Sequence, residues 1–488
     1  MTSASDPAGL ETGARPAAVS TVWTRARRIL ARPMVQAGVA IGVAGSGRVA
    51  LNSLVSLHFG TTLFSGYAAT VSAVILVGGL AAAGPAAAAT LGVARRWADR
   101  PGVLPTGLVR FLSAMVCLFL ALAAGTGLVW PATRGAMPAL LWLGGVTAYV
   151  WYQVARAFGY AIQRATAVTT AEIVGAIAPL GAVIAIGRAG LQQPLVPLLG
   201  CYLAGPLLYL VTFCAIVRRG IHVERAEISG SERRAGLREG VVFFVGAGSS
   251  MAMQYLPVIL ASRMQATTTA AVLFGAVQAT APLLLLSRVY GAVMMPSFAG
   301  DADDGQARLH LDLARPLFLP SLAVALGLAP LVAVSLGLQP AGEALSVAAL
   351  VALITLMQVW ATPAVTVLSA RKRELVPALA SVAGLGVAAL LWAWGIRTTV
   401  TLWLPVGLAV GAVVRSLVPM WVIGGWQWGR VGSPMLGTLA GAVGIAGAVV
   451  ALGNAAKSIA VIGGALLVAG GIAWGYWLWR RVDAHPPR

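Results

Sequence analysis

The sequence has few charged residues and almost no cysteine. Asp, Glu, Lys and Arg make up only 10% of its 488 residues, whereas they make up about 25% of a typical soluble protein, which excludes an ordinary soluble domain. The three cysteines, Cys117, Cys201 and Cys214, stand singly in apolar stretches. The sequence contains no CxxC pair and no Cys/His cluster, so we expect neither a disulfide framework nor a metal site.

The sequence also lacks the motifs of an enzyme. It has no glycine loop suited to cradling phosphate groups, no paired acids, and no Ser, His and Asp set of the hydrolase kind. We therefore expect no catalytic activity, no cofactor and no ATP site.

Hydrophobic residues, by contrast, make up 59% of the chain and follow one another in long stretches. About 20 apolar residues suffice to cross a bilayer as a helix, and the absence of polar–apolar alternation excludes the strands of a membrane barrel. We predict an all-α polytopic membrane protein. Its roughly fourteen transmembrane helices are expected at residues 35–58, 65–93, 108–130, 137–155, 166–187, 194–217, 241–262, 268–296, 316–338, 344–369, 376–396, 399–424, 433–453 and 458–479.

The few charges are distributed unequally. The chain has 34 Lys and Arg against 15 Asp and Glu. In this segmentation, 26 of the basic residues fall on the side of the N-terminus and 5 on the other side. Cytoplasmic loops are the ones enriched in basic residues, so we expect a multi-pass protein of the cell membrane with both termini in the cytosol. The charges flank helices rather than form one patch, which argues against a nucleic-acid partner.

The spacing of the helices predicts an internal duplication. Helices 1 and 7 begin near residues 35 and 241, and later pairs keep an offset of about 205–208 residues. Six helices per half return the chain to the same side, so the repeats are parallel. The predicted units are a basic tail (1–34), an N-lobe (35–217), a cytosolic linker (218–240), a C-lobe (241–424), and a final helix pair with a tail (425–488).

Three stretches resemble one transporter superfamily. Residues 64–96 have a Gly66-Tyr67 entry, an apolar run and a Gly84-Pro85 break. Residues 254–304 end in Pro-Ser-Phe and an acidic DADD loop, and residues 153–175 match the turn between helices 4 and 5. In this order and spacing, the stretches resemble the multidrug/oligosaccharidyl-lipid/polysaccharide exporter superfamily, in its polysaccharide-exporter branch.

The resemblance implies two six-helix lobes in a V, with helices 1, 2, 7 and 8 lining a central cavity. It also implies a flippase that moves a lipid-linked oligosaccharide, or a related anionic envelope precursor, between leaflets. The implied partners are that lipid-linked glycan, membrane lipids, and envelope glycosyltransferases or a polymerase. Many relatives carry an acid before the break in helix 2, where this chain has Ala81, Ala82 and Ala83, so coupling to a cation at that position is in question.

Charged residues inside the predicted helices are the main candidates for a site. A charge at mid-helix costs roughly 2.5–3.5 kcal/mol on insertion scales and usually faces a cavity or a partner. Arg48 follows Gly45 and precedes Asn52 and Ser56 at spacings of three and four residues, so these residues form one stripe on helix 1. We expect Arg48 and Asn52 to bind substrate phosphates or acidic sugars. A structural pair, for example with Glu172, is the alternative.

The remaining candidates lie on other helices. Arg288, late in helix 8, is expected to add positive charge to the cavity, unless it reaches toward the membrane surface. Glu172 either takes up a coupling ion or pairs with an arginine. Gln254 and Tyr255 on helix 7 are expected to bond sugar hydroxyls, although a lone Gln in a bundle more often bonds a neighbouring helix.

Two other functions are open. A multidrug or small-molecule exporter of the same superfamily would carry acids for cationic drugs, and only Glu172 lies in such a place. A membrane scaffold for envelope glycan synthesis would need no charged cavity.

Overall fold

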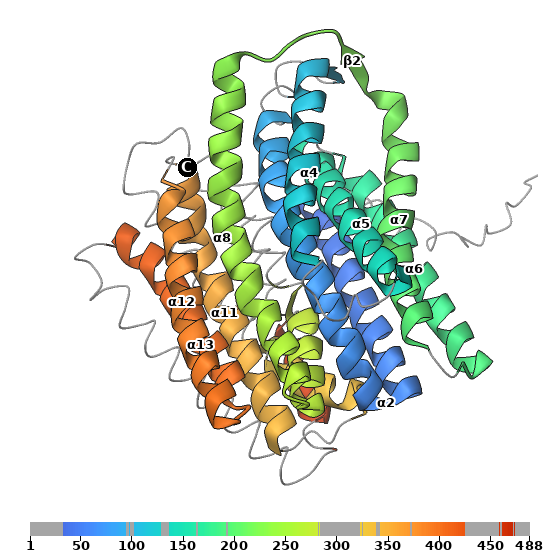
Figure 1. Ribbon diagram of the computed structural model, residues 1–488. Helices are drawn as coiled ribbons and strands as arrows, with labels where there is room; N and C mark the ends of the chain where they lie inside the picture. Colours follow the sequence, from blue (N-terminus) through green and yellow to red (C-terminus); the bar gives the residue numbers. More distant parts are fainter. Residues whose placement is uncertain are drawn as a thin grey trace, which may run out of the picture.

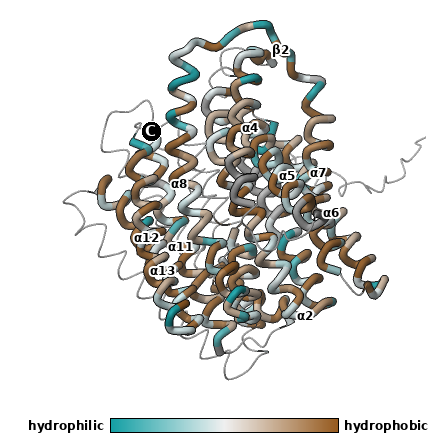
Figure 2. The backbone as a smooth tube through the Cα atoms, viewed as in Figure 1, coloured by the Kyte–Doolittle hydropathy of each residue, from teal (hydrophilic) through white to brown (hydrophobic). Residues whose placement is uncertain are grey.

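The computed structural model describes long stretches of the chain. The described residues are 33–93, 97, 102–127, 136–162, 164–191, 194–281, 283, 323–324, 326–337, 342–370, 373–424, 458, 461–471 and 473. Figure 1 shows them as long helices packed side by side. Figure 2 shows that hydrophobic residues run along most of these helices, whereas hydrophilic residues gather around the linker at β2.

The helices agree with the expected all-α membrane fold. Within the described residues, seven helices are long and apolar enough to cross a bilayer. The main elements are α2 (Pro33–Ala88), α4 (Thr106–Gly127), α5 (Ala136–Ala161), α6 (Ala165–Ala189), α7 (Leu195–Val217), α8 (Gly230–Arg263), α11 (Gly342–Ala370), α12 (Leu375–Thr398) and α13 (Trp403–Gly424). A short π-helix (Ala89–Val93) and a 3₁₀ turn (Arg218–Gly220) follow α2 and α7.

Element α2 contains the first two predicted helices. Gly60 interrupts it with a φ of 79° and a ψ of 164°, a backbone conformation that glycine adopts without steric cost. The expected break between residues 58 and 65 is therefore a turn centred on one glycine. The later break near Arg397 is also confirmed, because α12 ends at Thr398 and Thr399 adopts the left-handed conformation. The expected helix at 433–453 lies outside the described residues.

Two predicted boundaries are wrong. Helix α5 continues to Ala161, so Arg156 lies inside a helix and is buried rather than placed in a loop. Helix α8 begins at Gly230, well before the expected start at residue 241, because Ser229 and Glu232 form a capping box that starts the helix in the polar linker. Hydropathy alone places a boundary where charge begins, whereas a helix continues while its backbone bonds are satisfied.

The linker between the two halves is tied to an earlier loop. Strand β2 (His222–Glu224) pairs in parallel with β1 (Val103–Pro105). Glu227, just after β2, lies 3.4 Å from Arg110 and 2.7 Å from Arg233. In Figure 1 this segment passes from α7 to α8 over one end of the molecule.

Small residues allow the helices to approach closely, and they show the direction of each helix. Gly47 lies against Ala176 and Gly187 against His58, so the first segment of α2 runs parallel to α6. The same reasoning places the second segment of α2 antiparallel to α8, since Gly79 meets Met251 and Gly84 meets Gly240. These directions follow the alternation expected of successive membrane crossings.

Helix α8 lies between two groups of helices. We call residues 33–217 the first half and residues 230–424 the second half. Figure 1 shows α8 between the first-half helices, drawn blue to green, and α11, α12 and α13, drawn yellow to orange. Gly246 of α8 packs on Ala378 of α12, while Gly248 of the same helix packs on Leu80 of α2. Nearer to the turn at Gly60, Phe64 of α2 packs on Phe274 of the helix at 267–281, with their ring centroids 6.0 Å apart.

Candidate functional site: a charged cluster in the first half

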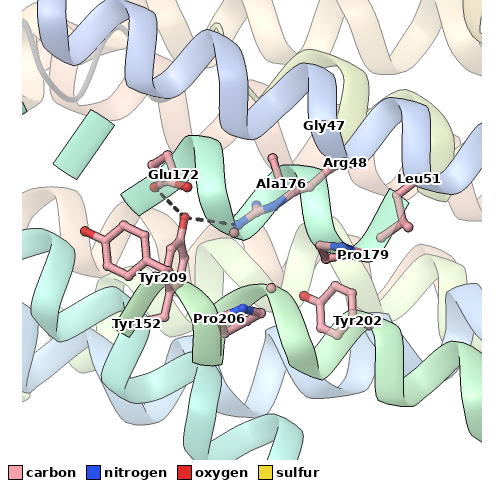
Figure 3. Close-up of a pocket in the computed structure, with 12 residues that line it drawn as sticks. Gly47, Arg48, Leu51, Tyr152, Glu172, Ala176, Pro179, Tyr202, Pro206 and Tyr209 are labelled. Carbon is pink, nitrogen blue, oxygen red and sulfur yellow. Dashed lines mark hydrogen bonds between the residues drawn. The ribbon is translucent and has the colours of Figure 1, made fainter. Parts of the chain in front are cut away.

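Four polar side chains from three helices meet inside the first half. Arg48 comes from α2, Tyr152 and Arg156 from α5, and Glu172 from α6. Tyr152 and Arg156 are four residues apart, which places them on one face of α5. The close approach of Gly47 to Ala176 brings α2 against α6, so that Arg48 enters the same space. Figure 3 shows three of the four side chains, Arg48, Tyr152 and Glu172, with the hydrogen bonds that join them.

The Tyr152 hydroxyl is the centre of this cluster. It donates a hydrogen bond to Glu172 Oε1 at 2.8 Å and accepts bonds from Arg48 Nη2 and Arg156 Nη1, both at 3.4 Å. In addition, Arg156 Nε lies 3.4 Å from Glu172 Oε1. The edge-on ring of Tyr209, with its centroid 4.7 Å from that of Tyr152, packs beside it. Arg48 and Glu172 are therefore linked through Tyr152.

The cluster carries a net charge. Arg156 and Glu172 are each 5% exposed, and at 3.4 Å they offset each other's charge. Arg48 is half-buried, and its guanidinium lies 5.9 Å from the centroid of the Tyr152 ring. Two arginines and one glutamate leave one positive charge among apolar helices. Such a charge is costly in a membrane and by default marks a functional position.

A small cavity lies beside Arg48. Its volume is about 60 Å³, enough for a few water-sized particles and far below the roughly 300–1,000 Å³ of a pocket for a drug-sized ligand. Within the described ranges, no cluster of three His, Cys, Asp or Glu has the composition of a metal site. The cavity is lined by Gly47, Arg48, Leu51, Tyr152, Glu172, Gly175, Ala176, Pro179, Tyr202, Gly205, Pro206 and Tyr209.

The rest of the predicted stripe on helix 1 is also turned toward protein. Asn52 is 5% exposed and Ser56 is 3% exposed. Ser56 Oγ donates a 2.9 Å hydrogen bond to the carbonyl of Leu336, which follows the helix at 326–335 of the second half. The stripe therefore joins the first half at Arg48 and the second half at Ser56. The expected substrate residue Arg288 lies outside the described residues.

Gln254 and Tyr255 take part in helix–helix hydrogen bonds. Gln254 Nε2 donates to Gln358 Oε1 at 3.1 Å, and the Tyr255 hydroxyl accepts from Gln278 Nε2 at 3.4 Å. Thr355 donates to Thr280 at 2.9 Å. The first bond joins α8 to α11, the second joins α8 to the helix at 267–281, and the third joins α11 to that same helix. The bonding of Gln254 to a neighbouring helix is the alternative that the sequence analysis left open.

Two members of the cluster, Tyr152 and Arg156, were not predicted from the sequence. Arg156 follows an apolar run, so its charge resembled the start of a loop. Its spacing of four residues from Tyr152, on a stretch of helix-forming residues, was the signal that could have placed both on one buried helix face. Glu172 lies 3.4 Å from Arg156, which corresponds to one of the two roles left open for it; coupling to an ion stays a prediction.

The second half contains a hydrogen bond at equivalent positions. Gln254 and Gln358 are separated by the same interval of the chain, 104, as Arg48 and Tyr152. A glycine pair recurs as well: Gly175 meets Gly205 between α6 and α7, and Gly384 meets Gly411 between α12 and α13. Helices α11, α12 and α13 also begin at nearly equal intervals after α5, α6 and α7, respectively. The two halves therefore match in helix order, in a glycine contact and in the position of one hydrogen bond.

The fold has known counterparts, although the sequence does not. The sequence matches no protein-family model and no curated protein. The structure is similar to the crystal structure of the eukaryotic MATE transporter AtDTX14, with a TM-score of 0.51 and 17% identity, covering 83% of this chain and 98% of that one. It is also similar to two structures of a multidrug resistance MATE family transporter of the MOP superfamily, one inward-facing and one outward-facing.

The inward-facing structure has a TM-score of 0.51 and 17% identity, covering 82% of this chain and 95% of that one. The outward-facing structure has a TM-score of 0.52 and 14% identity, and the match covers 82% of this chain and 94% of that one. At such identities the likeness concerns the fold alone. The chain is thus a polytopic, all-α membrane protein with the fold of MATE transporters.

Proposed function

We propose that the protein is a membrane exporter that moves small amphipathic organic solutes by alternating access. The observation that carries this proposal is the charged cluster of Arg48, Tyr152, Arg156 and Glu172 inside the first half. Ionisable groups at membrane depth are costly, and they recur where transporters bind or release ions and substrates. The similar fold supports the same proposal, because two of the similar structures are of a multidrug resistance MATE family transporter.

Element α2 would transmit changes in the cluster. Its first segment holds Arg48 against α5 and α6, and Ser56 on the same stripe bonds the carbonyl of Leu336 in the second half. A change in charge near Arg48 would therefore alter a helix that contacts both halves. Alternating access needs such an element, because a bound ion or solute can shift the equilibrium only if it contacts the two states differently.

The solute itself would pass between the halves rather than through the cavity beside Arg48. That cavity, of about 60 Å³, is too small for a drug-sized molecule. The predicted substrate role of Arg48 then becomes a role in coupling, shared with Glu172. Gln254 and Tyr255 would hold α8 in place, through the hydrogen bonds described above.

A flippase for lipid-linked oligosaccharides is the second candidate. The net positive charge at Arg48 favours it, because arginine binds phosphate oxygens with paired hydrogen bonds. The cavity beside Arg48 is, however, too small for a lipid-linked headgroup, and two of the similar structures are of a multidrug resistance MATE family transporter, which favours the organic-solute exporter.

Transport by the purified chain in proteoliposomes separates these functions. We expect protein-dependent movement of at least one solute in a panel of anionic, neutral and cationic fluorescent amphiphiles. Flipping of a short-chain lipid-linked glycan without movement of any amphiphile would overturn the proposal in favour of the second candidate. Movement of neither class would overturn both and favour the scaffold.

The variants Arg48→Gln and Glu172→Gln test the cluster. Each keeps a side chain that can hydrogen-bond Tyr152 and removes one charge. We expect transport to fall at least tenfold in both, while a matched loss of charge on the surface, Arg110→Gln (74% exposed side chain), leaves transport close to that of the parent chain. Unchanged transport in both cluster variants would remove the cluster from the mechanism.

A further inference from the structure

We propose that the cavity beside Arg48 binds one small inorganic anion of the size of chloride. The inference deepens the proposed function, since it names an ion that would regulate the same cluster. It stands on three observations: an unbalanced positive charge, a second hydrogen-bond donor turned inward, and a cavity volume that fits a small ion.

The first observation is the charge balance. Glu172 is engaged by Arg156 Nε at 3.4 Å and by the Tyr152 hydroxyl at 2.8 Å. In the part of the chain that the structure describes, no carboxylate forms an ion pair with the Arg48 guanidinium, whose one hydrogen bond goes to Tyr152 at 3.4 Å. A guanidinium has five N–H donors. Arg48 therefore has both charge and donors available to an anion.

The second observation is Tyr202. This residue of α7 lines the cavity, and its hydroxyl makes no hydrogen bond to a described residue. Figure 3 shows the hydroxyl of Tyr202 and the guanidinium of Arg48 both turned inward among the lining residues. A neutral tyrosine donates a hydrogen bond, and a donor beside a cation favours an anion rather than a second cation.

The third observation is the space and its walls. About 60 Å³ admits an ion of chloride size with a water molecule and is far below the volume that a drug-sized organic anion needs. Pro179, Pro206, Gly175 and Gly205 supply much of the wall, and none of these residues has a polar side chain to compete for the anion. Glu172 also lines the cavity, but its carboxylate is engaged by Arg156 and Tyr152, so the cluster keeps one net positive charge that attracts a counter-ion.

Binding can be measured on the purified full chain in lipid nanodiscs at constant ionic strength. Sodium gluconate is replaced stepwise by sodium chloride, and the unfolding temperature is recorded together with binding of radioactive chloride. We expect a saturable rise in unfolding temperature and one site per chain. Arg48→Gln should abolish both signals. Tyr202→Phe should weaken binding about tenfold, as expected for the loss of one charge-assisted hydrogen bond.

Arg110→Gln is the matched control, since it removes an exposed positive charge distant from the cavity and should keep the full chloride response. If Arg48→Gln fails to fold, Arg48→Lys keeps the charge without the guanidinium and should bind chloride more weakly but measurably. No saturable binding by the parent chain, or equal binding by Arg48→Gln, overturns the inference. The assay needs no transport: chloride binding without solute movement would overturn only the proposed function, and solute movement without chloride binding only this inference.

Discussion

The two halves place different chemistry at equivalent positions. In the first half, Arg48 bonds Tyr152; at the matching interval in the second half, Gln254 bonds Gln358. The remaining cluster residues also have neutral counterparts. Arg156 follows Tyr152 by one turn, and its counterpart Thr362 follows Gln358 by one turn and bonds the carbonyl of that residue. Relative to the two glycine pairs, Glu172 corresponds to Ser381, which bonds the carbonyl of Pro377 on its own helix.

This difference separates two roles of buried polar groups in membranes. The amide pair of the second half joins two helices at little cost, because neither group is charged. The charged cluster of the first half contains one short bond, from Tyr152 to Glu172 at 2.8 Å, whereas both arginine contacts to Tyr152 are 3.4 Å long. A neutral pair would join the helices without the cost of burying a charge, and the proposed ion-dependent step would give the charges of the first half a role. Under the predicted duplication, the first half would be the sensing half and the second half its structural counterpart.

The largest expected effect comes from breaking the buried ion pair. Arg156→Leu leaves Glu172 with Tyr152 as its described partner, and we expect the free energy of unfolding to fall by about 3–5 kcal/mol, because an unpaired buried charge remains. The counterpart change Thr362→Val removes a hydroxyl that bonds its own helix and should lower it by less than about 1 kcal/mol. Denaturant-induced unfolding in mixed micelles measures both. Equal losses of unfolding free energy in the two variants would show that the charged side chain of the first half is no more important for stability than its neutral counterpart.

The next effect comes from placing the charge of the first half into the second. Gln254→Arg puts a guanidinium beside Gln358 with no acid at position 381, and we expect a loss of about 2.5–3.5 kcal/mol, the insertion cost of a charge at mid-helix. Adding Ser381→Glu should restore part of the loss, because an acid then stands where the first half has Glu172. Unfolding of the single and double variants in the same micelles measures the difference. A single variant as stable as the parent would mean that the second half tolerates charge as the first does.

A smaller effect distinguishes the two glycine pairs. A methyl group on Gly175 would lie 2.9 Å from the carbonyl oxygen of Gly205, and one on Gly384 would lie closer still to that of Gly411. Backbone cannot move aside as a flexible side chain can, so Gly384→Ala should destabilise by about 1–3 kcal/mol and Gly175→Ala by less. The unfolding temperature of each variant in detergent tests this order. The reverse order would show that α6 and α7 are the more tightly packed pair.

The sequence predicted the helices well because hydropathy reports what lipid requires. Apolar runs of sufficient length become helices, and the single-residue break at Gly60 was visible as a short gap between runs. The start of α8 was misplaced because capping by Ser229 and Glu232 extends a helix beyond the apolar part that hydropathy detects. The expected fold was confirmed at the level of a polytopic, all-α membrane protein with a fold similar to that of MATE transporters.

The candidate site was predicted only in part because tertiary contacts decide which charges meet. Arg48 and Glu172 stood out as charges inside helices, and the stripe with Asn52 showed which side of helix 1 turns from lipid. Nothing local to Tyr152 shows that its hydroxyl would join two arginines and an acid, since two of those partners lie on other helices, far from it in the sequence. The proposed substrate, too, depends on a path between helices that no single motif encodes.

The smallest expected effect isolates the neutral bond of the second half. Gln254→Leu removes its 3.1 Å hydrogen bond to Gln358 and should lower the free energy of unfolding by about 0.6 kcal/mol, the average for hydrogen bonds between membrane helices. The double variant Gln254→Leu/Gln358→Leu should be no less stable than the single one, because it leaves no unpaired amide. Chloride binding should be unchanged in both. A loss of several kcal/mol, or of chloride binding, would show that the amide pair does more than join α8 to α11, and the contrast between the halves would then have to be redrawn.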